Sequence, residues 1–405
     1  MKRPVEALQV FLAFDARRIL VGRLAIKERQ IWFEYDRHFL DLALPISPLQ
    51  LPIKPGLQRC NDKIFDGLFG VFNDSLPDGF GRLLLDRHLR AQGIMPESLT
   101  PLDRLAYVGH QCMGALCYQP EHIAASFSNA HLELDQLAQE AHAVLEQDND
   151  VYVEELLQLN GSSNGARPKV MVLLSPNKER ILPLHAKAPK TYEPWIIKFP
   201  SHLDPKDIAQ IEFAYSLMAR AAGIDMPKTH LFPGQKKHYY FGIQRFDRVQ
   251  DKRFHVHTLC GLLHSDHRIP ALDYEDLLKA TLYLTKDHQQ VQKAFRLAAF
   301  NVLAHNRDDH GKNFSFLMNA EGQWQLAPAY DLTFSYGPGG EHSTTVMGEG
   351  KKPTLKHLRA LAALFALPDA EGILAEVTAT IKQWPKFAAL AQLKQSATQQ
   401  IQRHF

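Results

Sequence analysis

Hydrophobic and polar residues alternate along the first part of the chain. Segments 5–14, 18–26 and 30–35 carry this alternation and are rich in β-forming residues, which predicts three short antiparallel strands. Further on, the turn sequence Pro77-Asp78-Gly79 precedes a run with helical spacing that begins near Phe80 and stops at Gly93. The pattern therefore predicts a β-rich N-terminal part that ends in a helical region.

The middle of the chain returns to strand patterns, and the last part becomes helical. A polar stretch at 126–150 predicts a connecting helix, and a helical run at 207–224 interrupts strands expected at 169–175, 194–201 and 238–248. Helices are expected at 274–285, 289–306 and 354–367, followed by a helical C-terminal region. We therefore predict an α+β fold with a β-rich subdomain at 1–125, a second β-rich subdomain at 126–254 and a helical part at 255–405.

Composition and charge exclude some classes of protein. Apolar residues make up 45% of the chain and charged residues 22%, as in ordinary soluble domains. The net charge is only +2, which does not indicate a protein that coats nucleic acid by bulk charge. The four cysteines lack zinc-ribbon spacing and fit a reducing compartment. Glu6, Gln9 and Asp15 interrupt the apolar N-terminus, so we expect a cytoplasmic protein without a signal peptide or a membrane segment.

The segment "HNRDDHGKNFSFL", residues 305–317, concentrates groups that bind metals or transfer protons. It follows an apolar helix and precedes a short apolar strand, so it is expected to be a loop. Asp308 lies five positions before Asn313, as the base aspartate and the magnesium-binding asparagine do in the kinase loop H-R-D-L-x-x-x-N. The histidine stands one place too early for that motif. This spacing alone leaves a metal-hydrolase cluster open as well.

Phosphoryl transfer needs further groups, and the chain offers each of them in the kinase order. Backbone amides of "NGSSNGARPK", residues 160–169, could surround phosphates. Lys198 stands in an otherwise apolar strand, and Glu212 lies in the following helix, where the two could form an ion pair. Asp331 follows the strand after the 305–317 loop and supplies a second carboxylate for a metal ion.

Several of these segments together resemble one family. "GSSNGARPK", "WIIKFPS", "IEFAYSLMARAAGI", "GIQRFDR", "NRDDHGKNFSFL" and "LAPAYDLT" are similar to the signature blocks of HipA-type serine/threonine kinases, the toxins of bacterial toxin–antitoxin modules. The resemblance extends to the N-terminal part through "FDGLFGVFNDSLPDGFGRLLL". It implies a kinase-like bilobal fold with an extra β-rich N-terminal subdomain and a mostly helical C-terminal lobe.

The resemblance also implies a role for individual residues. Asp308 would accept the proton of the substrate hydroxyl, Lys198 would contact the ATP phosphates and pair with Glu212, and Asn313 and Asp331 would hold Mg²⁺. The strand at 242–248 would be a hinge beside the nucleotide, where Gln244 and Phe246 flank adenine and Asp247 lies near the ribose. The full set expected to bind ATP is Gly161, Ser162, Ser163, Asn164, Gly165, Ala166, Lys169, Lys198, Gln244, Phe246, Asp247, His310 and Tyr330.

Regulation and partners are implied by the same resemblance. Ser162 falls where the family carries an autophosphorylated serine, with Ser163 beside it as the second candidate. The family's substrates include aminoacyl-tRNA synthetases, and its usual partner is a small helix-turn-helix antitoxin, through which DNA is reached only indirectly. One departure is Gln244, where the best-known member has a glutamate.

Two other functions remain open from the residues alone. One is a metal-dependent phosphohydrolase or nuclease that uses His305, Asp308, Asp309 and His310. The other is a kinase-like protein that binds its partner without catalysis. The histidines and the aspartate of "HSDHR", at 264–268, are also residue types that bind zinc. The chain has no second cluster with the spacing of zinc ligands, which favours a solvated loop.

Overall fold

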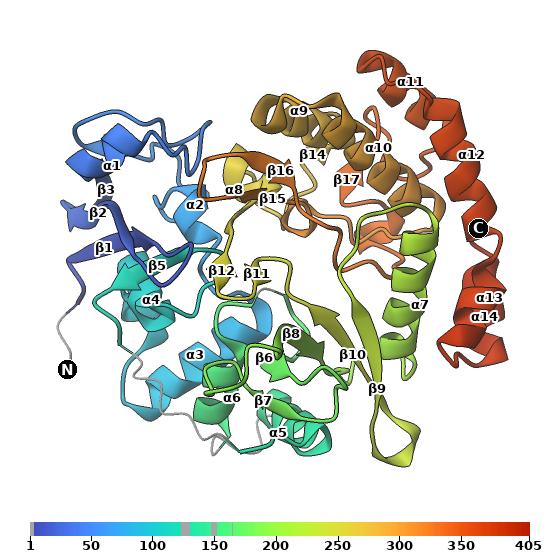
Figure 1. Cartoon of the computed structure of the whole chain (residues 1–405), viewed down its shortest axis with the longest axis horizontal. Coiled ribbons are helices and arrows are strands. Elements are labelled where there is room, and N and C mark those ends of the chain that lie inside the picture. The colour runs from blue at the N-terminus through green and yellow to red at the C-terminus, as the bar shows by residue number, and fades with distance from the viewer. Residues whose placement is uncertain (1–3, 123–129, 147–151, 164) are drawn as a thin grey trace. The chain divides into compact units, whose positions relative to one another are not determined.

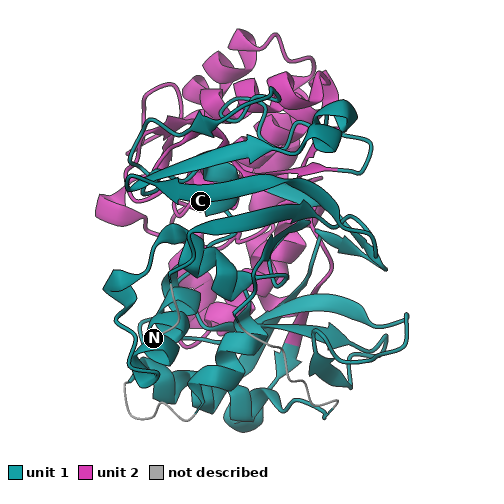
Figure 2. Cartoon of the chain, turned by 90° about the vertical axis from the view of Figure 1, so that its left-hand side faces the viewer, with its two compact units in different colours: residues 1–205, 232–256, 319–322 teal, residues 206–231, 257–318, 323–405 magenta. Residues whose placement is uncertain are grey.

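The computed structural model of the chain describes residues 4–122, 130–146, 152–163 and 165–405. The chain forms two compact units, coloured separately in Figure 2. Unit 1 consists of residues 1–205, 232–256 and 319–322, and unit 2 consists of residues 206–231, 257–318 and 323–405. This division differs from the three expected parts: no boundary falls near residue 125, and the helix that carries Glu212 groups with the C-terminal part.

The first sheet of unit 1 is antiparallel and follows the alternation in the sequence (Figure 1). Its strand order is β4-β3-β2-β1-β5. Leu8, Val10 and Leu12 point to the buried face of β1, which fixes its register against β2. The three strands expected in this region are confirmed. The strands are β1 (Ala7–Leu12), β2 (Ile19–Lys27), β3 (Gln30–Tyr35), β4 (Gln58–Arg59) and β5 (Leu116–Gln119).

A second sheet has the order β7-β6-β8-β10-β9, and its strands β6, β7, β8 and β10 belong to unit 1. A buried apolar cluster joins it to the helices at 79–91, 134–145 and 153–160, with Leu84, Val144, Leu156, Val170 and Trp195 among its members. Burial of such side chains, at about 1.5–3 kcal/mol each, is what holds these helices in place. The strands are β6 (Lys169–Leu174), β7 (Ile181–Pro183), β8 (Glu193–Lys198), β9 (Thr229–Pro233) and β10 (Tyr239–Gln244).

The helices of unit 1 begin and end at recognisable signals. Thr100 and Asp103 form a capping box at the start of α4, and the turn at Asp78 precedes α3 as the sequence predicts. The helices are α1 (Arg37–Leu42), α2 (Gly70–Asn73), α3 (Gly79–Ala91), α4 (Pro101–Val108), α5 (Leu134–Leu145) and α6 (Val153–Asn160). The helix expected over 126–150 is thus observed over its described central part.

Unit 2 is mostly helical. Helix α10 is buried along most of its length and packs on α9 and α12, and α13 packs on α7. Small strands complete the unit: β14 (Leu272–Asp273), β15 (Ser315–Met318), β16 (Trp324–Leu326) and β17 (Thr344–Thr345). The helices are α7 (Ile208–Ala221), α8 (Leu259–Leu263), α9 (Tyr274–Thr285), α10 (His288–Leu303), α11 (Leu355–Leu364), α12 (Ala370–Ile381), α13 (Trp384–Leu390) and α14 (Gln395–Gln402).

Two loops of unit 2 carry the residues with catalytic potential. One joins α10 to β15 and contains residues 305–314, and the other follows β16 and contains Asp331. In unit 1, the loop between α6 and β6 contains the expected phosphate-binding residues. Among the residues that the structure describes, no helix is both long and apolar enough to cross a membrane.

Candidate active site

The two adjacent aspartates of the α10–β15 loop lie in opposite environments. The side chain of Asp308 is 55% exposed, whereas that of Asp309 is 0% exposed. Oδ2 of Asp309 accepts hydrogen bonds from the hydroxyl of Tyr274 at 2.7 Å and from Nδ1 of His342 at 2.8 Å. Of the two carboxylates, Asp309 is thus enclosed and Asp308 is open to solvent, and the role of Asp308 as the base stays a prediction.

Asp309 instead fastens a later segment to this loop. Its Oδ1 accepts the backbone N–H of Ser343 at 2.8 Å and that of Thr344 at 3.3 Å. Burial, together with the neighbouring Asp309 carboxylate, raises the pKa of Tyr274, so the phenol stays protonated and remains a donor. These bonds satisfy the buried charge and hold residues 342–344 against the loop.

Asn313 is oriented by a bond to the backbone of the same loop. Its Nδ2 donates to the carbonyl oxygen of Asp308 at 2.7 Å. Because the amide nitrogen is committed to this carbonyl, the side-chain oxygen Oδ1 is the atom left to bind a cation. The sequence spacing of five residues is thus matched by a direct contact between the two positions.

Tyr330 ties the Asp331 loop to the loop that contains Asn313. Its hydroxyl donates to the carbonyl of Lys312 at 2.6 Å and lies 2.6 Å from the hydroxyl of Ser315, which donates to it in turn. Asp331 itself has a φ of 59°, a left-handed conformation uncommon for residues other than glycine. Such backbone outliers persist where the surrounding structure imposes them, often at functional sites.

The donor types of Asn313 and Asp331 fit magnesium. Mg²⁺ prefers oxygen ligands and is usually bound through one or two side chains, with water and substrate phosphates completing its shell. An amide oxygen and a carboxylate carried by two linked loops of one unit meet that requirement. Their role as metal ligands stays a prediction.

A histidine pair borders Asp308. Nε2 of His310 lies 4.0 Å from Oδ1 of Asp308, and the ring of His267 meets that of His310 edge-on with centroids 5.5 Å apart. Nδ1 of His310 is buried and has no hydrogen-bond partner among the described residues. The segment 264–268, expected to be only a solvated loop, therefore contacts the loop that contains Asp308. Its spacing in the sequence gives no signal of this.

The metal-hydrolase cluster is not supported by the geometry. Within the described part of the chain, His305, Asp308, Asp309 and His310 do not bring their ligand atoms together as a metal site requires. Nδ1 of His305 faces the carbonyl of Ser335 at 3.2 Å, and burial, with Arg307, lowers the pKa of His305 to about 4. Asp309 is occupied by the contacts described above.

The glycine-rich loop of unit 1 begins at Gly161, which ends α6 with a φ of 55°. Ser162 is fully buried: its Oγ accepts the backbone N–H of Met113 at 2.8 Å and approaches the carbonyl of Gln111 at 3.4 Å. Ser163 is buried as well and donates to Oδ1 of Asn160 at 3.0 Å. Gly165 and Ala166 follow at the surface side of the loop, and Asn164 lies outside the described residues.

Two lysines of the second sheet face each other across adjacent strands. Lys169 on β6 and Lys198 on β8 are register partners, and both are largely buried. Nζ of Lys198 lies 5.7 Å from the ring centroid of Phe241 on β10. Glu212 is buried in α7 of unit 2, whereas Lys198 belongs to unit 1, so their ion pair stays a prediction.

One residue of the expected hinge, Asp247, is enclosed by arginine side chains. Gln244 and Phe246 are partly exposed, as adenine contacts would require. Asp247 is fully buried, and its carboxylate binds Arg245 at 2.7 and 2.9 Å and Arg248 at 2.6 Å. Burial alone would raise the pKa of Asp247, but the two arginines lower it overall. Both carboxylate oxygens of Asp247 are thus bound within the protein, and its expected place near the ribose stays a prediction.

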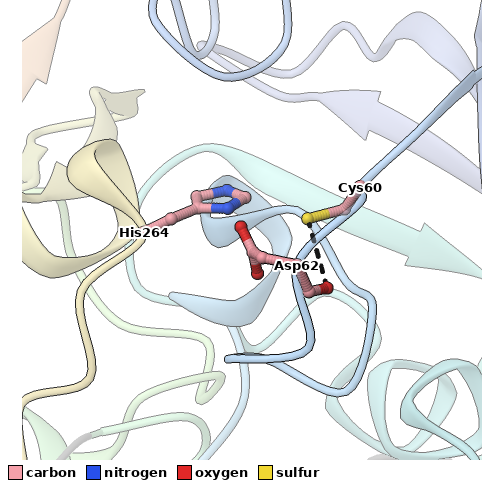
Figure 3. Close-up of side chains that lie close together, drawn as sticks. All are labelled: Cys60, Asp62 and His264. Atoms are coloured by element: carbon pink, nitrogen blue, oxygen red, sulfur yellow. Dashed lines mark hydrogen bonds between the residues drawn. The ribbon is translucent and has the colours of Figure 1, made fainter.

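One further group of polar side chains is drawn in Figure 3. Sγ of Cys60 lies 3.8 Å from the carbonyl oxygen of Asp62, both in unit 1. His264 belongs to unit 2, and we assign no metal site to these residues.

Two protein-family models match this chain, one in its N-terminal part and one in its C-terminal part. The family model described as the HipA-like C-terminal domain matches residues 161–384, more than half of the chain. The model described as the HipA N-terminal domain matches residues 12–119. The expected family resemblance is thereby confirmed.

Individual relatives have modest identity. A protein of Sinorhizobium fredii named "Putative kinase Y4mE" is 26% identical over 358 residues, which are 82% of this chain and 78% of that protein. A Haemophilus influenzae protein named "Putative kinase" is 28% identical over 196 residues, 45% of this chain and only 55% of that protein.

A solved structure shares the fold. It is a chain of the Shewanella oneidensis MR-1 toxin–antitoxin complex of HipA, HipB and operator DNA, with a TM-score of 0.69 at 17% identity, covering 98% of this chain and 94% of that one. The expected kinase-like α+β fold is therefore confirmed.

Proposed function

Since the chain belongs to the HipA family, we propose that it is an ATP- and Mg²⁺-dependent serine/threonine protein kinase and the toxin of a bacterial toxin–antitoxin module. The observation that carries this proposal is the arrangement around Asp308. An exposed carboxylate stands beside Asn313, whose amide is oriented by the Asp308 carbonyl, and the loop of Asp331 is bound to the same loop through Tyr330.

In this mechanism Asp308 orients the hydroxyl of a substrate serine or threonine and accepts its proton. Oδ1 of Asn313 and the carboxylate of Asp331 would hold Mg²⁺, which supplies charge neutralisation at the phosphates when it is bound. Lys198 would bind the phosphates as a buried cation, with Glu212 as its partner. Residues 161–166 would add backbone donors, and Gln244 and Phe246 would border adenine.

The proposals for the substrate and for the partner rest on membership of the family alone. The complex from Shewanella oneidensis contains HipB and operator DNA. We accordingly propose a helix-turn-helix antitoxin as the partner of this chain and contact with DNA only through it. An aminoacyl-tRNA synthetase is the proposed class of substrate, and Ser162 or Ser163 is the proposed site of autophosphorylation.

The test is a transfer assay with labelled ATP. The purified full chain is incubated with Mg²⁺, γ-labelled ATP and a bacterial lysate, and labelled proteins are identified; Asp308→Asn is run in parallel. The proposal expects label on serine or threonine of a lysate protein, dependent on Mg²⁺ and absent with the variant.

The rival functions give different results in the same assay. Release of inorganic phosphate or cleavage of nucleic acid without labelled protein would support the phosphohydrolase or nuclease. Binding of ATP with no transfer to any protein would support the non-catalytic binding protein.

A further inference from the structure

The turn Asp78–Gly81, at the start of α3, packs directly on the glycine-rich loop within unit 1. The carboxylate of Asp78 accepts a hydrogen bond from the backbone N–H of Gly165, and the backbone N–H of Phe80 donates to the carbonyl of Gly165 at 3.2 Å. Both backbone polar groups of Gly165 are therefore bound by one segment that lies 87 residues earlier at Asp78. Two such bonds fix the position and the orientation of this peptide.

Glycine is required for this close approach. Gly79 has a φ of 46°, and a Cβ there would lie 2.5 Å from the carbonyl oxygen of Gly165 and 2.7 Å from Cα of Ala166. A Cβ at Gly81 would lie 2.5 Å from Nδ2 of Asn160, the last residue of α6. The motif Pro77-Asp78-Gly79 is thus more than a helix start, because its backbone touches the backbone of the loop.

Gly165 also has a buried cation beside it. Its φ is 107°, and a Cβ there would lie 2.5 Å from Nζ of Lys169, the first residue of β6. Backbone amides in glycine-rich loops and lysine side chains are the groups that bind phosphate oxygens in proteins. The Asp78 turn therefore binds the part of the loop that lies beside Lys169.

We propose that Asp78 is a positioning residue for the nucleotide phosphates: with Gly79 and Gly81 it holds the glycine-rich loop in its phosphate-binding conformation. This inference rests on the proposed function, because it takes ATP as the ligand. It gives the N-terminal domain a part in the nucleotide site, through the contact of the Asp78 turn with Gly165. Asp78 does not touch the reacting atoms in this role; it acts through the loop backbone.

The test compares a ligand that has phosphates with one that lacks them. Calorimetric dissociation constants for Mg²⁺–ATP and for adenosine are measured with the full chain and with Asp78→Ala, Asp78→Asn and Gly79→Ala. Removing the Asp78 acceptor is expected to weaken ATP binding roughly tenfold, the usual effect of one hydrogen bond to a charged group. Adenosine affinity is expected to stay unchanged. Asparagine keeps a side-chain oxygen, so Asp78→Asn is expected to recover most of the ATP affinity.

Gly67→Ala is the matched control for Gly79→Ala. Gly67 also has a positive φ, 80°, but a Cβ there meets nothing within 4 Å. Both variants carry the same kind of backbone strain, and only Gly79→Ala presses on Gly165 and Ala166. We expect ATP affinity to fall with Gly79→Ala alone.

The inference fails if Asp78→Ala binds ATP like the parent chain, or if ATP and adenosine affinities fall together, which would indicate general damage to unit 1. Tighter ATP binding by Asp78→Asn would also overturn it, because Asp78 would then compete with phosphate. A parent chain that binds no ATP at all would overturn both this inference and the proposed function. If the parent chain binds ATP and phosphorylates protein, and Asp78→Ala binds ATP equally well, only this inference is overturned and the proposed function stands.

Discussion

Nδ1 of His342 lies 2.8 Å from Oδ2 of Asp309, and both side chains are buried. This pair joins a segment beyond Asp331 to the loop that carries Asp308. The neighbouring Asp308 is exposed, so a buried structural aspartate directly follows the aspartate that we propose as the base.

Exchanging each of these aspartates for asparagine should separate the two roles. Asp308→Asn is expected to lower the rate of phosphate transfer a hundredfold or more, the usual effect of losing a general base, with little change in stability. Asp309→Asn replaces a carboxylate oxygen with an N–H₂ group that faces the hydrogen-bond donors of Tyr274 and His342 or of the backbone at 343–344. This change should cost about 2–5 kcal/mol of unfolding free energy. Urea unfolding and a labelled-ATP assay measure the two effects. Near-normal transfer by Asp308→Asn would instead assign the base to another residue.

The role of Asp331 can be read from ligand-induced stabilisation. Asp331→Asn should reduce the rise in melting temperature that Mg²⁺–ATP produces, because the metal loses a carboxylate ligand. Asp225→Asn, at an exposed surface aspartate of the same unit, is the control and should keep the full shift. If Mg²⁺–ATP raised the melting temperatures of both variants equally, Asp331 would not be a ligand of the metal.

Phosphorylation of Ser162 should change the glycine-rich loop. Ser162 is buried and bonded to Met113 and Gln111, so a phosphate carrying roughly two negative charges cannot be accommodated there without breaking those contacts. After incubation with Mg²⁺–ATP, peptide mapping is expected to find phosphate on Ser162 or Ser163, and the modified chain is expected to bind ATP more weakly. Substrate phosphorylation with both serines unmodified would show that this switch is absent.

The buried Asp247 ion pair should contribute to stability in a pH-dependent way. Asp247→Asn leaves Arg245 without its charge partner and should cost about 3–5 kcal/mol of unfolding free energy. The control Asp251→Asn, at an exposed pair with Lys190, should leave the stability almost unchanged. The pKa of Asp247 is lowered in the folded state, so its contribution is complete above the unfolded pKa of about 3.9 and is lost as the pH falls below it. Urea unfolding should therefore show the parent and Asp247→Asn converging in acid. A constant gap between them would contradict the lowered pKa.

The sequence by itself determined the local elements and the chemical inventory. Alternation placed β1 to β3, and helical spacing placed α7, α9, α10 and α11, because burial of one face imposes its period on the residues. Spacing also paired Asp308 with Asn313, since residues within one short loop remain neighbours whatever the rest of the chain does.

Only the tertiary structure decided which polar residues are buried and what they bind. Neighbours in sequence such as Asp308 and Asp309 have the same chemistry, and burial of one depends on Tyr274 and on His342, which are far away in the chain. The same reason explains Asp247, expected at a ribose but enclosed by arginines, and Asp78, expected only to begin a helix but bonded to Gly165. Contacts between distant residues depend on how the elements pack, and no local pattern of the chain records that packing.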